Sequence, residues 1–143
     1  MSKADILIID DERDLVESLR VILEIQDYRV RAAYNGRDGL ALAEAQAPDL
    51  FILDVMMTTV TEGFDLAYKI KRHPRLKDVP ILLVSGFMQK MAELGPDKFQ
   101  HILGQDWPVN AFLEKPLDPL QLLDVIDGLL KDRISTEVSD LSL

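Results

Sequence analysis

Polar residues able to carry out chemistry stand where several short apolar runs of this chain end. They are Asp10, Asp11, Asp54, Ser85 and Lys115. The carboxyl ends of parallel strands meet at one edge of a sheet, so these residues gather there if the runs are such strands. Two carboxylates about 5 Å apart repel each other by roughly 3 kcal/mol at an effective dielectric constant near 20. Three carboxylates in one place are therefore costly unless a cation joins them.

The chemistry of these groups is that of a metal-assisted phosphoryl acceptor. Carboxylate oxygens are ligands that suit Mg²⁺ or Mn²⁺, and a hydroxyl and an ammonium group can bind phosphate oxygens. Each residue also has a simpler use, because Asp10 or Asp11 can cap a helix and Asp54 and Ser85 suit turns. Lys115 alone is an ordinary solvated charge. The joint placement of all five after four different runs favours a shared site.

The apolar runs define the strands that must position these residues. The runs span residues 6–9, 28–33, 50–53, 79–84 and 111–113. The first, third and fourth are apolar at every position, as in strands buried on both faces of a parallel sheet. The run at 28–33 alternates, with Val30 and Ala32 on one face and Arg29 and Arg31 on the other. This alternation suits an edge strand.

Helical periodicity fills most of the intervals between the runs. Apolar residues recur at helical spacing within 15–23, 40–47, 64–70 and 120–130. Alternating strands and helices predict an α/β fold with a parallel sheet. Glycines and prolines interrupt the pattern at 87–110, where we expect a helix near 87–94 and then an enlarged segment. We expect one domain over residues 1–133 and a flexible tail over 134–143.

Composition excludes several classes of function. The chain has 143 residues, of which 48% are hydrophobic, so it can bury an ordinary core. Its net charge of −9 argues against a nucleic-acid-binding surface, and the absence of cysteine excludes thiolate metal sites. No apolar run could span a bilayer, and the N-terminus is unlike a secretory signal. We therefore expect a cytoplasmic protein that binds neither nucleic acid nor membrane.

Four motifs together resemble the receiver domain of two-component response regulators. They are Leu7-Ile-Ile-Asp-Asp-Glu12, Asp54 followed by Met57 and Gly63, Ser85-Gly86, and Lys115-Pro116. The resemblance covers about residues 4–131. It implies a flavodoxin-like (βα)5 doubly wound sandwich whose five parallel strands lie in the order 2-1-3-4-5. It also implies three kinds of partner: a sensor histidine kinase, a histidine phosphotransfer protein and a downstream effector protein.

The resemblance implies a role for each matching residue in a phosphoryl transfer. Asp54 would accept the phosphoryl group, and Lys115 would pair with that group. Ser85 and Phe112 would be the switch residues that move when the group is bound. The peptide bond between Lys115 and Pro116 would be cis.

The resemblance also implies a metal site. Asp10, Asp11 and Asp54 would hold Mg²⁺, with Mn²⁺ as a possible substitute. The backbone carbonyl of Met56 would be a further metal ligand. The metal would offset charge on the transferring group.

Departures from the family pattern keep alternatives open. Thr58 stands where the family usually has proline, and Gly63 comes one residue late. A degenerate receiver would bind partners without phosphorylation. An aspartyl-nucleophile phosphatase is a second alternative, but it would need another aspartate where Met56 stands. A flavin-binding domain is a third, but the acidic run at 10–12 would repel the flavin phosphate. We expect a stand-alone receiver, which is a phospho-acceptor and not an enzyme.

Overall fold

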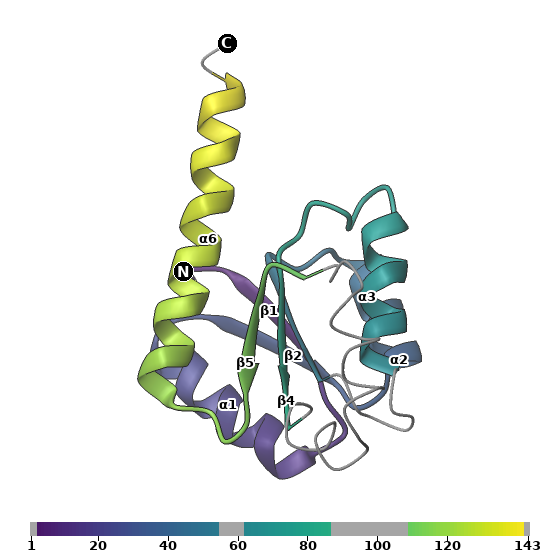
Figure 1. Ribbon diagram of the computed structural model, residues 1–143, viewed down its shortest axis with the longest axis vertical. Coiled ribbons are helices and arrows are strands. Elements are labelled where there is room, and N and C mark those ends of the chain that lie inside the picture. The colour runs from purple at the N-terminus through teal and green to yellow at the C-terminus, as the bar shows by residue number, and fades with distance from the viewer. Residues whose placement is uncertain (1–2, 55–61, 87–108, 142–143) are drawn as a thin grey trace, which may run out of the picture.

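A five-stranded parallel sheet forms the centre of the computed structural model, which describes residues 3–54, 62–86 and 109–141 (Figure 1). The strands are β1 (Asp5–Ile9), β2 (Arg29–Ala33), β3 (Leu50–Asp54), β4 (Ile81–Ser85) and β5 (Ala111–Glu114). They lie in the order β2-β1-β3-β4-β5, and every neighbouring pair is parallel. This order confirms the predicted flavodoxin-like fold.

The apolar runs form strands because apolar side chains at successive positions can be buried on both faces of a central strand. Every residue of β1 and β3 is buried, as expected for central strands covered on both faces. Strand β2 lies at the edge of the sheet, and its residue Arg29 is exposed. The predicted edge strand is therefore confirmed.

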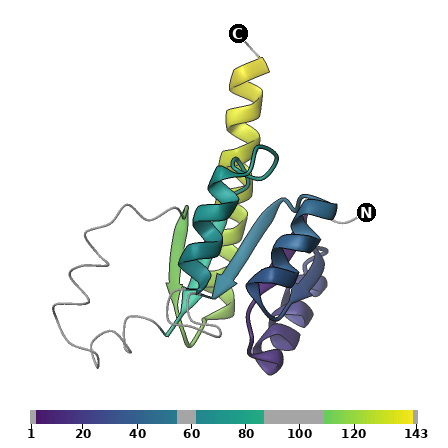
Figure 2. The same cartoon turned by 90° about the vertical axis from the view of Figure 1, so that its right-hand side faces the viewer.

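Two helices cover each face of this sheet within the described residues. The helices are α1 (Arg13–Ile25), α2 (Gly36–Ala45), α3 (Glu62–Arg72) and α6 (Pro119–Leu141). Helices α2 and α3 lie on one face and α1 and α6 on the other (Figures 1 and 2). None of the described helices combines the length and apolar character needed to cross a lipid bilayer.

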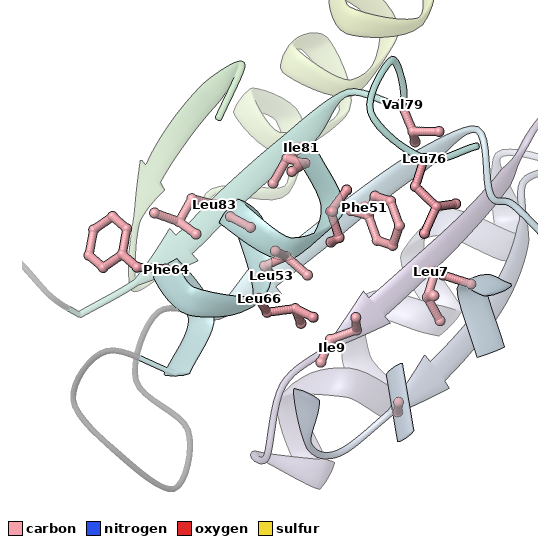
Figure 3. Packing of buried hydrophobic residues seen from close by; sticks show 14 residues of the cluster. Leu7, Ile9, Phe51, Leu53, Phe64, Leu66, Leu76, Val79, Ile81 and Leu83 are labelled. Carbon is pink, nitrogen blue, oxygen red and sulfur yellow. The ribbon is translucent and has the colours of Figure 1, made fainter. Parts of the chain in front are cut away.

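The alternation of side chains along the strands gives the fold two separate cores. Leu7 and Ile9 of β1 point into the core under α2 and α3, together with Phe51 and Leu53 of β3 (Figure 3). The residues between them in sequence point into the core under α1 and α6. Successive side chains of a strand point to opposite faces, so each strand contributes to both cores. Both faces of the strands that lead to the candidate residues are therefore packed against helices.

Helix α6 is longer than the sequence predicts. A flexible tail was expected from residue 134, whereas the helix continues to Leu141. Its second half extends away from the sheet (Figure 1). Residues 129–141 contain neither glycine nor proline, so no residue there interrupts the backbone hydrogen bonds. The helix predicted near 87–94 and most of the enlarged segment lie outside the described residues.

Candidate functional site

Three aspartates meet where β1 and β3 end. Asp10 directly follows β1, and its backbone amide donates to the carbonyl of Ala33, which extends the pairing with β2. Asp54 is the last residue of β3. Both aspartates are buried, while Asp11 is exposed. One carboxylate oxygen from each of the three lies within 4.8 Å of the others.

Lys115 reaches this cluster from the loop after β5. Its Nζ donates to Asp10 Oδ2 at 3.1 Å and to Asp54 Oδ2 at 3.4 Å. A third contact joins Nζ to Glu12 Oε1 at 3.4 Å. The peptide bond between Lys115 and Pro116 is cis, as the resemblance implies. The structure thus brings together four of the predicted site residues from the ends of three strands.

The electrostatics of the site show an excess of negative charge. Burial raises the pKa of the Asp10 carboxyl to about 6, and the neighbouring Asp54 carboxylate adds to this rise. A hydrogen bond from the Glu12 amide and the charge of Lys115 act in the opposite direction. Burial alone would lower the pKa of Lys115, but the Asp10 and Asp54 carboxylates raise it above its ordinary value.

This donor set fits a divalent cation. It consists of carboxylate oxygens, and three carboxylates, those of Asp10, Glu12 and Asp54, share one ammonium group. Mg²⁺ prefers oxygen ligands and is commonly bound through one or two carboxylates. Asp10, Asp11 and Asp54 are therefore the residues that could hold it.

The raised pKa of Asp10 predicts how stability depends on pH. A carboxyl whose pKa is higher in the folded state destabilises that state once it ionises. The cost grows as pH rises from the ordinary value of 3.8 towards 6. We expect Asp10→Asn to raise the free energy of unfolding of the metal-free protein by about 1–3 kcal/mol above about pH 6. Urea unfolding across a pH series measures this difference.

Two controls separate charge from shape in this measurement. Near about pH 4 and below, the Asp10 carboxyl of wild type is mostly protonated and the asparagine of the variant is uncharged. The two proteins should then have nearly the same free energy of unfolding. In saturating Mg²⁺ the order should reverse, because ligand binding stabilises wild type more than the variant. A stability difference that is constant across the pH series would contradict the electrostatic explanation.

The remaining predicted residues are placed only in part. Ser85 is the last residue of β4, so its backbone lies at the same sheet edge, paired in register with Glu114. The ring of Phe112 is partly buried and packs against the core under α2 and α3. Met56 lies outside the described residues. Their suggested roles remain predictions.

Glu12 is the residue of this site that the sequence analysis left without a role. It stands at the N-cap of α1, yet its side chain makes no capping hydrogen bond and contacts Lys115 instead. Serine, threonine, aspartate and asparagine are the usual N-cap residues. A glutamate at that position was the available signal.

An apolar groove opens next to the site. It has a volume of about 550 Å³ and lies between α1 and the loop that leads into α6. Its apolar walls are formed by Leu15, Leu19, Ile22, Leu117, Pro119 and Leu122. Glu12, Gly86 and Lys115 also line it, so the groove adjoins the charged site.

The fold and this cluster define the chain's family. Residues 6–127 match the response regulator receiver domain. The chain belongs to this family of two-component signalling proteins.

Particular relatives are similar over nearly the whole chain. The DNA-binding dual master transcriptional regulator RpaA of Synechocystis is 35% identical over 90% of this chain and 51% of its own length. The response regulator ArlR of Staphylococcus aureus is 28% identical, over 96% of this chain and 57% of its own. The chain therefore spans about half the length of these curated relatives.

A solved structure shows the same architecture. NtrX from Brucella abortus in complex with ADP superposes with a TM-score of 0.78 at 28% identity. The match covers 100% of this chain and 30% of that protein. In NtrX the matching fold is therefore one part of a longer chain.

Proposed function

We propose that this chain is a receiver that takes a phosphoryl group from a phosphorylated histidine onto Asp54, in a reaction that depends on Mg²⁺. One observation carries the proposal. Asp10 and Asp11 after β1, Asp54 at the end of β3 and Lys115 after β5 converge: one oxygen of each aspartate lies within 4.8 Å of the others, and Lys115 Nζ contacts Asp10 and Asp54. Maintaining three carboxylates at this spacing is costly, so the arrangement favours a function that uses them.

The residues divide the reaction between them. An Asp54 oxygen attacks phosphorus, the new P–O bond forms as the P–N bond to the donor histidine breaks, and the histidine nitrogen keeps the electron pair. Lys115 would offset negative charge on the transferring oxygens. Mg²⁺, held by Asp10, Asp11, Asp54 and the carbonyl of Met56, would neutralise further charge when bound. Catalysis of this kind is mainly positioning and electrostatic stabilisation.

The product would act as a switch. An acyl phosphate adds negative charge at the end of β3, and that charge would attract Lys115 and the hydroxyl of Ser85. Phe112, whose ring is partly buried against the sheet, would repack in response. In this proposal the protein is modified itself and is no enzyme for a separate substrate.

The groove beside Lys115 suits a protein donor. Its walls are apolar and it adjoins the acceptor site, so a partner could bury apolar side chains there while presenting its phosphohistidine. A sensor histidine kinase or a histidine phosphotransfer protein would be the donor, and an effector protein would read the product. A cytoplasmic location belongs to the same proposal. The net charge of −9 led to the prediction of no nucleic-acid partner, but the relative RpaA is named as a DNA-binding regulator, so the comparisons do not support that prediction.

Incubation with acetyl phosphate tests the proposed function. With Mg²⁺, the wild-type chain should gain one phosphoryl group by intact mass, and a chelator should suppress the gain. Hydroxylamine should then remove the group, because it attacks acyl phosphates and leaves phosphoserine intact. If neither acetyl phosphate nor a phosphorylated histidine kinase modifies the chain, the degenerate receiver becomes the better description.

A further inference from the structure

We infer that Glu12 is a positioning residue that competes with the phosphoryl group for Lys115. By holding the ammonium, Glu12 would weaken anion binding at Asp54 and strengthen cation binding. The inference rests on the proposed function, because it concerns the same site. It adds a residue whose charge sets the balance between the two ligands.

The hydrogen-bonding capacity of Lys115 supports this role. An ammonium group has three donors. In this structure they face Asp10 at 3.1 Å, Asp54 at 3.4 Å and Glu12 at 3.4 Å. While Asp54 is still a carboxylate, an incoming phosphoryl oxygen can therefore accept a hydrogen bond from Nζ only if one carboxylate gives up its contact.

Burial indicates which carboxylate gives way. The Asp10 side chain is 1% exposed and that of Asp54 is 4% exposed, whereas that of Glu12 is 60% exposed. The folded protein is strongly destabilised when a buried carboxylate loses the cation that it pairs with. An exposed one is rehydrated at little cost. Glu12 is thus the partner that Lys115 can leave.

The start of α1 gives an independent indication. Glu12 occupies the N-cap, but its side chain makes no hydrogen bond to the helix. Asn35 at the start of α2 does what an N-cap residue usually does, since its Oδ1 accepts from the amide of Asp38 at 2.8 Å. A missing cap typically costs a helix about 1 kcal/mol. The carboxylate of Glu12 is therefore directed to Lys115 at the expense of local helix stability.

A charge acting in this way has an unusual signature. Removing it should weaken the binding of a cation and strengthen the binding of an anion at the same site. Damage to the geometry of the site would weaken both. The opposite signs therefore distinguish a role for the Glu12 charge from a merely structural one.

The experiment compares wild type, Glu12→Gln and Glu17→Gln. Glu17 is a matched control, because its side chain on α1 is 61% exposed and pairs with Arg20. Calorimetric titration with Mg²⁺ alone comes first. Titration with beryllofluoride, a phosphoryl mimic, follows at saturating Mg²⁺ and is read by ¹⁹F NMR.

For Glu12→Gln we expect about two- to fivefold weaker Mg²⁺ binding and about two- to fivefold tighter beryllofluoride binding, as for an exposed ion pair. Both changes should shrink as salt is raised. Glu17→Gln should match wild type. If wild type binds both ligands and Glu12→Gln shifts them in the same direction or not at all, this inference alone is wrong. If wild type binds neither ligand, the proposed function fails and takes the inference with it.

Discussion

Asp54→Asn is expected to abolish phosphoryl uptake from acetyl phosphate. The amide of asparagine carries no negative charge and is a poor nucleophile, although its size and shape match the carboxylate. We expect the rate of uptake to fall by at least about 10³-fold, which corresponds to about 4 kcal/mol in activation free energy. Intact mass measured over a time course with Mg²⁺ gives the rate of phosphoryl uptake for wild type and for the variant.

The control for this variant is the same change at an exposed position outside the site. Asp124 lies on the exposed surface of α6, so Asp124→Asn should take up the phosphoryl group as wild type does. Asp54→Asn should also stay folded, since the Asp54 charge raises the pKa of buried Asp10 and is a source of repulsion. Uptake at an undiminished rate by Asp54→Asn would move the acceptor to another residue and refute the assignment.

The positions of these groups followed from the sequence because a topological rule fixed them. Asp10, Asp54 and Lys115 each come after an apolar run, and parallel strands place such residues at one edge. The role of Glu12 did not follow, because its rotamer decides whether it caps α1 or contacts Lys115. Sequence spacing indicates which backbone positions are neighbours, but it does not determine which rotamer a side chain such as that of Glu12 adopts.

The same distinction applies to the fold. The central strands were predictable since their burial demands apolar residues on both faces. The end of α6 was not, because serines and threonines after Arg133 are compatible with both a helix and a coil. The alternation of β2 predicted an edge strand, but it did not indicate that Arg31 would find a buried partner at the opposite end of the sheet from the site.

That partner makes Arg31 the basis of the second large expected effect. Arg31 Nε lies 3.1 Å from Asp5 Oδ1, and the two side chains are 16% and 12% exposed. The guanidinium also donates to the carbonyls of Leu42 and Gln46 at the end of α2. Among the described residues, the other oxygen of Asp5, Oδ2, is buried without a hydrogen-bond partner. Arg31 therefore supplies the positive charge that this carboxylate needs.

We expect Arg31→Met to lower the free energy of unfolding by about 3–5 kcal/mol, because it leaves the Asp5 carboxylate buried without a counter-charge. Adding Asp5→Leu should recover most of the loss, since the carbonyls of Leu42 and Gln46 are exposed and can bind water.

Arg29→Met is the matched control: Arg29 is exposed on the same strand, and its replacement should cost less than about 0.5 kcal/mol. Urea unfolding without Mg²⁺ measures all four proteins. If the double variant is no more stable than Arg31→Met, the loss does not come from the unpaired Asp5 charge, and the contacts of Arg31 with α2 become its main contribution to the fold.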